Sequence, residues 1–428
     1  MSKLKRMSLM SVAACALIAP VAFGQTDNFY SRNKYEAVMD RAQPEFDPEP
    51  VRLGAFLVRS QADLGLTATN NVFASATNEE SDIIARIGGQ FVADTDWSVH
   101  SVGFGASAYR NEYLDLSDES TTDLTARLGG RLDVTRSFSV GGYVFAEDRA
   151  EPRTEFVNDF GVDKPIQFTR TGVVAEANYQ NDRIRWNNSV GVTDENFDDG
   201  RTIVGGFNVD QDFRDRSIMQ GRSRLSYAWT PDFAVYAQGT FTDSNYDNEQ
   251  IIGGLPRSRD SKGYTVAGGV DFELTSLVRG DIAVGYLNEE KDDSFFADVS
   301  GLSLDARMQW FPTRLTTVGF NAGRRVVDTG AFDSPSAVET SFGARVDHEL
   351  RRNIVLSGYG SVYNYEYEEN DRKDDNVEFG AIATYKMNKR VHWEAFVRNR
   401  DRDVSGSSVF GDPSYGVTSA GIGLRLYP

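Results

Sequence analysis

Arginine and carboxylate side chains recur at alternate positions along many short segments of the chain. Alternate side chains of a β-strand point to the same face, so we expect each segment to have one charged face. Rings of charge on such faces could select solutes, and guanidinium planes could grip anionic or sugar groups. The residues that we expect on the charged faces are Arg127, Arg131, Arg222, Arg224, Asp305, Arg307, Arg325, Arg345, Asp347, Glu378, Glu394, Arg398, Arg400 and Arg425.

The histidine and cysteine residues of the chain give little indication of a catalytic or metal site. The three histidines, His100, His348 and His392, are scattered along the chain. His348 directly follows Asp347, so in a strand the two side chains would point to opposite faces. Cys15 is the single cysteine, and neither a histidine cluster nor a cysteine pair offers ligands to a transition metal. We therefore expect no enzyme, no catalytic residue, no cofactor and no metal site.

About eighteen stretches of alternating apolar and polar residues between Leu53 and Pro428 carry these side chains. In residues 302–310, Leu-Ser-Leu-Asp-Ala-Arg-Met-Gln-Trp, every second residue is apolar. A long domain of such segments behind a secretion signal favours a closed barrel with lipid outside and water inside. The predicted fold is an all-β, antiparallel transmembrane barrel of about eighteen strands. Sixteen strands remain an alternative, because residues 204–216 and 293–299 are poorly defined.

Two kinds of connection join the segments, as in outer-membrane barrels with short periplasmic turns and long extracellular loops. The tight ones are Thr230-Pro231-Asp232, Phe311-Pro312-Thr313, Arg351-Arg352-Asn353 and Asn388-Lys389-Arg390. The longer, acidic ones are residues 78–82, 115–123, 194–200, 289–293 and 366–376. Such acidic loops could bind divalent cations, but none has the spacing of an EF-hand, and we favour solvated loops.

The first 24 residues have the pattern of a secretory signal peptide. Lys3, Lys5 and Arg6 precede an apolar run that ends in Ala22-Phe23-Gly24, which offers small residues at a cleavage site. A membrane anchor and a lipoprotein processed at Cys15 are the disfavoured alternatives. We expect residues 1–24 to be removed, 25–52 to form a periplasmic lead-in and 53–428 to form the barrel. No later stretch approaches 18 apolar residues, so we expect no membrane helix.

The net charge and the predicted signal peptide together limit the classes of binding partner. The formal net charge of −18 argues against nucleic-acid binding. A secreted barrel of this kind is expected in the outer membrane of a Gram-negative bacterium. Its expected partners are outer-membrane lipid, lipopolysaccharide and the barrel assembly machinery.

The barrel hypothesis assigns the two faces of each strand. A charge facing lipid near the bilayer midplane costs about 2–4 kcal/mol, so the arginines and carboxylates should face the lumen. There they could equally pair across strands and stiffen the wall, and this structural role stays open beside permeation. Trp97, Trp229, Trp310 and Trp393 lie close to tight turns and suggest a periplasmic aromatic girdle. For Tyr359, Tyr363, Tyr365 and Tyr367 we favour an outer girdle over a sugar-stacking track.

Residues 39–73 carry a family resemblance. They include Met39-Asp40-Arg41-Ala42-Gln43-Pro44, then Arg52-Leu53-Gly54-Ala55-Phe56-Leu57 and Thr69-Asn70-Asn71-Val72-Phe73. This opening resembles that of the second putative β-barrel porin family, although Asp47-Pro48-Glu49-Pro50 stands where we expect a glycine near position 50. The resemblance implies an outer-membrane barrel of about eighteen strands that supports exopolysaccharide export, with periplasmic export machinery as a partner. The alternatives are a general diffusion porin for small hydrophilic solutes and a structural or adhesive surface barrel.

Overall fold

The computed structural model describes residues 36–155, 161–203, 205–275, 277–331, 334–406 and 414–428. The predicted signal peptide lies outside the described residues. Within those ranges, no helix is long and apolar enough to cross a membrane.

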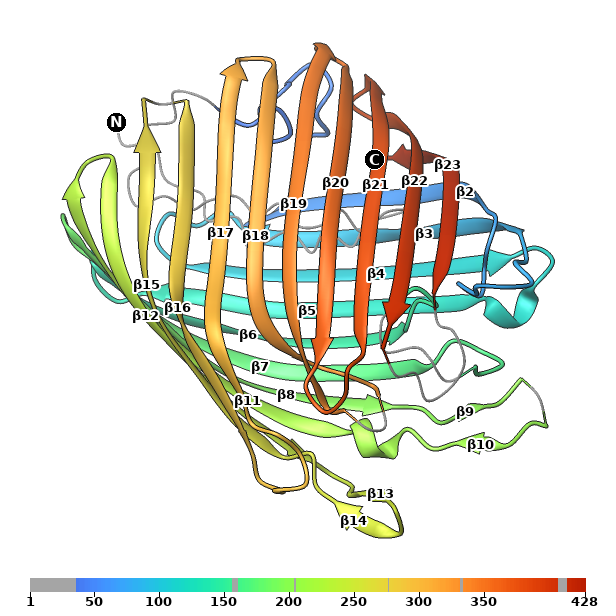
Figure 1. Cartoon of the computed structure of the whole chain (residues 1–428). Coiled ribbons are helices and arrows are strands. Elements are labelled where there is room, and N and C mark those ends of the chain that lie inside the picture. Colours follow the sequence, from blue (N-terminus) through green and yellow to red (C-terminus); the bar gives the residue numbers. More distant parts are fainter. Residues whose placement is uncertain (1–35, 156–160, 204, 276, 332–333, 407–413) are drawn as a thin grey trace.

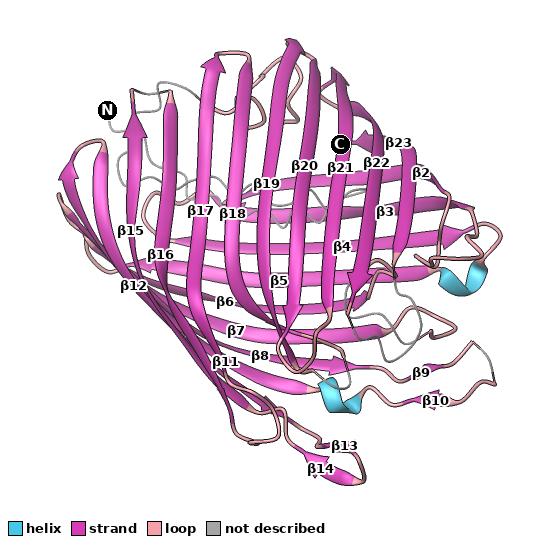
Figure 2. Cartoon of the chain, viewed as in Figure 1, coloured by secondary structure: helices cyan, strands magenta, loops and turns pink. Residues whose placement is uncertain are grey.

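Eighteen antiparallel strands form one closed barrel, which confirms the predicted fold and strand number (Figure 1). Figure 2 shows that almost everything between them is loop, apart from two single-turn helices, η1 (Ser117–Glu119) and η2 (Asp212–Arg214). The barrel strands are β2 (Phe56–Thr69), β3 (Asp82–Thr95), β4 (Ser101–Tyr113), β5 (Thr121–Asp133), β6 (Phe138–Ala150), β7 (Gln167–Gln180), β8 (Ile184–Phe197), β11 (Arg216–Thr230), β12 (Phe233–Tyr246), β15 (Ser261–Leu274), β16 (Val278–Lys291), β17 (Val299–Thr313), β18 (Thr316–Asp328), β19 (Ser336–Arg351), β20 (Ile354–Tyr367), β21 (Lys373–Asn388), β22 (Val391–Ser405) and β23 (Tyr415–Leu426).

The barrel closes where β23 pairs with β2, from Ala62 opposite Leu426 to Thr69 opposite Ser419. The start of β2 extends beyond the end of β23, and there the short strand β1 (Val51–Leu53) takes over as its partner. Gly54, with a φ of 61°, allows the tight turn between β1 and β2. Closure with this extra strand pairs edges that would otherwise bind another chain.

The connections follow the predicted two kinds, but several predicted bounds are wrong. The segments 194–200, 289–293 and 366–376 include residues of β8, β16 and β21. Phe311 and Pro312 do not form a turn, because β17 continues to Thr313 and the chain reverses at Arg314 and Leu315. A break in register between Trp310 and Thr313 accommodates the proline, which cannot donate a ladder hydrogen bond.

The alternative of sixteen strands is wrong, because eighteen barrel strands form without the two poorly defined segments. Residues 205–215 and 293–298 lie in connections between barrel strands. Between β8 and β11 the chain forms the small hairpin β9 (Gly200–Arg201) and β10 (Asn208–Val209), followed by η2. Residues 292–298 connect β16 with β17. A second small hairpin, β13 (Gln250–Ile252) and β14 (Leu255–Arg257), extends the loop between β12 and β15. Both hairpins project from the end of the barrel that carries the long loops (Figure 1).

Glycines on the inner face let aromatic rings lie flat against the wall. Tyr236 stands directly opposite Gly269 in the pairing of β12 with β15, and a Cβ on Gly269 would lie 2.2 Å from Tyr236 Cζ. The same relation joins Tyr109 to Gly88, Tyr143 to Gly129, Phe145 to Gly172, Tyr359 to Gly380 and Phe396 to Gly421. The rings therefore cover exposed backbone and keep out of the centre of the lumen.

Candidate functional site

All the predicted lumen residues lie on the strand face opposite to the exposed apolar side chains. Arg127, for example, alternates with Leu124 and Leu128, which are 45% and 50% exposed. The role of this face in permeation stays a prediction. The residues that share it are Arg127, Arg131, Arg222, Arg224, Asp305, Arg307, Arg325, Arg345, Asp347, Glu378, Glu394, Arg398, Arg400 and Arg425.

Many of these charges are paired along the wall. Arg224 of β11 reaches across β12 and β15 to Asp281 of β16, and its guanidinium lies 3.4 Å from the centre of the Tyr236 ring. The Tyr236 hydroxyl donates to the same carboxylate, with 2.8 Å between the oxygens. On β19, Arg345 Nε lies 2.9 Å from Asp347 Oδ1. Such pairs stiffen the wall, as the structural alternative predicts.

Arg400, Glu378 and Tyr359 form a second cluster across β20, β21 and β22. Arg400 Nε donates to Glu378 Oε2 at 2.8 Å, and the Tyr359 hydroxyl donates to Oε1 at 3.2 Å. Glu378 is only 2% exposed. A carboxylate this deeply buried needs both partners, because an uncompensated buried charge would be strongly destabilising.

The interpretation of the β20 tyrosines as an outer girdle is wrong. Leu356 and Val362 are the exposed residues on the lipid side of β20, and the tyrosines occupy the alternate positions. They therefore face the lumen, where Tyr359 and Tyr367 are buried and the other two are partly exposed. The set that forms this tyrosine track is Tyr359, Tyr363, Tyr365 and Tyr367.

The tryptophans at the ends with the short turns are exposed on the outer surface. The four predicted for the girdle, Trp97, Trp229, Trp310 and Trp393, are 51%, 69%, 44% and 42% exposed. Trp186, which sequence analysis missed, is 48% exposed on the same side of β8. Trp186 lies two residues after the start of β8, close to the short turn between β7 and β8, and this position could have identified it.

The loop between β6 and β7 folds across the extracellular mouth. Thr154 Oγ1 accepts a hydrogen bond from Arg400 at 2.8 Å, and the Thr154 carbonyl accepts one from the Tyr415 hydroxyl at 2.7 Å. These partners belong to β22 and β23, several strands away around the barrel. An ion pair between Arg153 and Glu119, at 2.6 Å, fixes the base of the loop. Sequence analysis missed these loop residues.

Glu155 follows Thr154 at this crossing. Burial raises the pKa of its carboxyl above the ordinary value of 4.5, and it outweighs the opposing effect of Arg400. Glu151 on the same loop adds to the rise. The proton affinity of Glu155 is therefore linked to the docked position of the loop.

A second set of contacts joins the top of β18 and its loop to strands farther along the wall, from β16 to β11. Asp328 of β18 pairs with Arg216 of β11 at 2.8 Å. Arg259, which is fully buried, donates to the carbonyl of Thr329. Ser336 Oγ, at the start of β19, donates to Glu289 of β16 at 3.1 Å. Together with the β6–β7 loop, these contacts narrow the extracellular mouth.

The N-terminal lead-in lines the inner rim at the end with the short turns. Arg41 pairs with Glu349 of β19, and Asp47 pairs with Lys386 of β21, both at 2.7 Å. His392 Nε2 lies 3.0 Å from the carbonyl oxygen of Phe46. The segment is irregular but bound to at least three strands of the wall.

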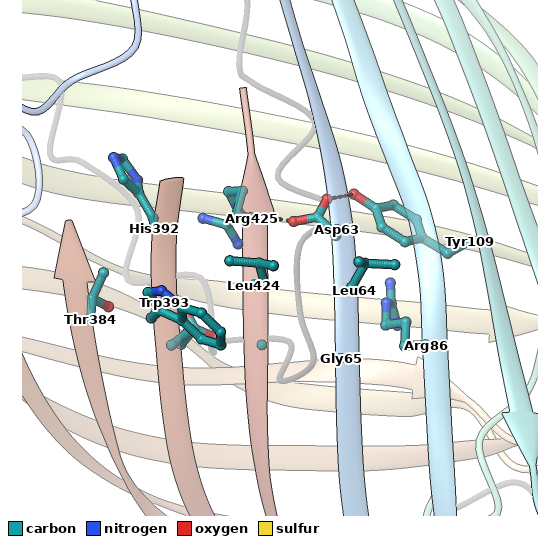
Figure 3. A pocket seen from close by; sticks show the side chains of 12 residues that line it. Asp63, Leu64, Gly65, Arg86, Tyr109, Thr384, His392, Trp393, Leu424 and Arg425 are labelled. Carbon is teal, nitrogen blue, oxygen red and sulfur yellow. Dashed lines mark hydrogen bonds and ion pairs between the residues drawn. The ribbon is translucent and has the colours of Figure 1, made fainter. Parts of the chain in front are cut away.

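A pocket lies at the closing seam between β23 and β2 (Figure 3). Asp63 stands at its centre and accepts hydrogen bonds from Arg425 Nε at 3.0 Å and from the Tyr109 hydroxyl at 2.9 Å. Arg86 lies over the Tyr109 ring, 4.2 Å from its centre. Gln61 Nε2 also donates to Asp63, at 3.0 Å, so the cluster fastens the seam.

Three carboxylates of the β8–β11 loop come close enough to hold a cation. Asp199, Asp210 and Asp212 offer oxygens within 4.8 Å of one another, and all three are exposed. Backbone N–H groups of Gln211 and Asp212 donate to the first two carboxylates. These loop hydrogen bonds account for the arrangement without an ion.

Similar proteins are found both as a sequence family and among solved structures. The family model described as putative beta-barrel porin 2 matches residues 43–427. No curated protein matches the chain. Solved structures with a similar fold include the copper transporter OprC (10% identity, TM-score 0.49, covering 89% of this chain and 82% of that one) and Pseudomonas aeruginosa OccK2 (9%, 0.46, 86% and 98%). A mutant ferric enterobactin receptor from Pseudomonas aeruginosa is also similar (6%, 0.47, 86% and 80%).

Proposed function

The chain belongs to the putative beta-barrel porin 2 family, and from this premise we propose that it supports export of an exopolysaccharide across the outer membrane. Its contribution is a polar conduit and a docking surface for the periplasmic export machinery. The proposal involves no catalytic step. Outer-membrane lipid, lipopolysaccharide and the barrel assembly machinery complete the proposed set of partners.

The tyrosine track on β20 is the observation that carries the proposal. Aromatic side chains combine a large apolar face with a polar hydroxyl, which suits sugar rings with apolar C–H faces and polar edges. Tyr363 and Tyr365 are the partly exposed members, and they stand two residues apart on one face, about 6–7 Å along the strand. Arginines and carboxylates of β21 and β22 beside the track could bind sugar hydroxyls.

The lead-in supports the choice of periplasmic partners. Residues 36–50 bind the inner rim of the barrel and do not cover the short turns. The ion pairs of Arg41 and Asp47 with strands of the wall hold them there. The turns at Arg352 and Lys389 lie beside this segment and remain largely exposed, because the side chains of these residues are 78% and 42% exposed. This rim is the surface that a periplasmic partner would meet.

The test is the amount of polysaccharide outside the cell and in the periplasm of a strain that lacks the gene. Loss outside with accumulation inside would support export. Complementation with Tyr363→Ala/Tyr365→Ala should restore the barrel but not full secretion. Tyr264→Leu/Tyr286→Leu is the matched control, since these tyrosines are 45% and 49% exposed on the lipid face. Normal secretion with reduced uptake of small hydrophilic solutes would overturn the proposal in favour of a general diffusion porin.

A further inference from the structure

Three arginines lie at mid-height on the lumen wall. Arg127 is the central residue of β5, Arg398 is the central residue of β22, and Arg222 is one residue from the centre of β11. The three strands lie on separate parts of the barrel. We call these residues the arginine belt.

The belt carries positive charge that no carboxylate neutralises directly. In the described part of the chain, none of the three arginines has a carboxylate oxygen within 4.0 Å. The Arg127 guanidinium lies over the Tyr143 ring at 3.6 Å from its centre, and Arg222 Nη2 donates to Gln238 Oε1 at 2.7 Å. Both contacts fix the side chains while leaving their charge in place.

Two ion pairs lie close to Arg222. Arg224 and Arg307 act electrostatically on it, and their carboxylate partners Asp281 and Asp305 act on it with the opposite sign. These pairs are close to neutral, so Arg222 supplies the unpaired positive charge on β11. Glu176 of β7 lies in the same cross-strand row, two strands away.

Distance along the strands separates Arg127 and Arg222 from the acidic loops. Each belt residue is at least six residues from either end of its strand, which is about 20 Å along the strand. The Debye length at physiological ionic strength is about 8 Å. The loop carboxylates beyond the strand ends are therefore screened at Arg127 and Arg222, where a low-dielectric wall focuses the field. Arg398 lies two residues from Arg400, which binds Thr154 of the β6–β7 loop, so that loop comes closer to it.

We propose that the arginine belt makes the lumen anion-selective and that the exported chain is an acidic polysaccharide, with carboxylate, sulfate or phosphate groups along it. This inference rests on the proposed export function. Guanidinium groups bind such anions through paired N–H donors. Three separate sites around the wall allow an anionic chain to pass from one to another without tight binding at any one site, as conduction requires.

The test uses the purified full chain in planar lipid bilayers with a KCl gradient. The reversal potential of the wild type should indicate preference for chloride, against the sign expected from a net charge of −18. Arg127→Gln/Arg222→Gln/Arg398→Gln should lower the chloride-to-potassium permeability ratio several-fold. Arg110→Gln/Arg136→Gln/Arg201→Gln removes the same charge from positions outside the lumen wall and should leave the ratio unchanged.

A blocking experiment identifies the substrate class. Hexagalacturonate, an acidic oligosaccharide, should interrupt the wild-type current more strongly than neutral maltohexaose, and the belt variant should lose this difference. Cation selectivity of the wild type, or equal shifts in belt and control variants, would overturn the belt proposal. A barrel that inserts but carries no current would instead contradict the proposed conduit, so the two failures can be told apart.

Discussion

Arg425 on the last strand of the barrel donates a hydrogen bond to Asp63 on the first, with Arg425 Nε and Asp63 Oδ1 3.0 Å apart. The two residues are also direct cross-strand partners in the pairing of β2 with β23. They are 362 residues apart in the chain. The seam that closes the barrel is thus fastened by a charge pair as well as by backbone hydrogen bonds.

Removal of the seam carboxylate should weaken closure. In Asp63→Ala, Arg425 and the Tyr109 hydroxyl lose their shared acceptor, and we expect a loss of about 1–3 kcal/mol in the free energy of unfolding. The measurement is the urea midpoint at which the heat-modifiable gel band is lost. Asp305→Ala is the control, because Asp305 is half-exposed and pairs with Arg307 on its own strand. Equal effects of the two variants would contradict a special role for the seam.

A methyl group at Gly269 should disturb the wall. The added Cβ would lie 2.2 Å from Tyr236 Cζ and 2.6 Å from the carbonyl oxygen of Ile282. Overpacking of this kind costs about 1–3 kcal/mol, and thermal unfolding of the folded barrel would measure it. Gly239→Ala, where a Cβ meets nothing within 4 Å, should change stability by no more than about 0.5 kcal/mol. A harmless Gly269→Ala would show that the ring moves aside without cost.

An arginine on the lipid face should impair the barrel, whereas one on the lumen face should be tolerated. Leu128 lies beside the centre of β5 and is 50% exposed to lipid, so Leu128→Arg should cost about 2–4 kcal/mol. Thr125→Arg places the same side chain on the lumen face of the same strand, opposite Glu147 of β6. Heat-modifiable migration of the membrane fraction should reveal less folded Leu128→Arg than Thr125→Arg. If more of the Leu128→Arg variant folded than of the lumen-face variant, the assignment of the lipid and lumen faces would be wrong.

Docking of the β6–β7 loop should depend on pH through Glu155. Its pKa is raised in the docked loop, because burial disfavours the charged form. Stabilisation of the docked loop by protonation is therefore fully present below the ordinary value of 4.5 and is lost as pH rises through the raised pKa. We expect single-channel conductance to fall on acidification, as the loop closes over the mouth.

Glu155→Gln separates this effect from the titration of other groups. The amide keeps the size of the side chain and stays uncharged, so the low-conductance state should persist at neutral pH. Arg400, whose hydrogen bond to Thr154 holds the same loop, remains intact in this variant. If wild type and Glu155→Gln show the same pH profile, the loop does not respond through this carboxyl.

The sequence by itself determined the barrel, its strand number and the two faces of each strand. An alternating pattern is local, so Leu302, Leu304 and Trp310 could be assigned to one face without knowledge of any contact. The same rule would have placed the β20 tyrosines correctly, because Leu356 and Val362 occupy the lipid-facing positions. Preference for an aromatic girdle overrode that signal.

Only the tertiary structure decided how the mouth is built. Thr154 and Arg400 are 246 residues apart, and Asp328 pairs with Arg216 although four strands separate β18 from β11 in the wall. Loop residues have no periodicity that constrains their direction, so their contacts depend on where closure of the barrel brings distant strands. Local alternation fixes which way a strand side chain points, whereas the path of a loop depends on partners that only the closed barrel supplies.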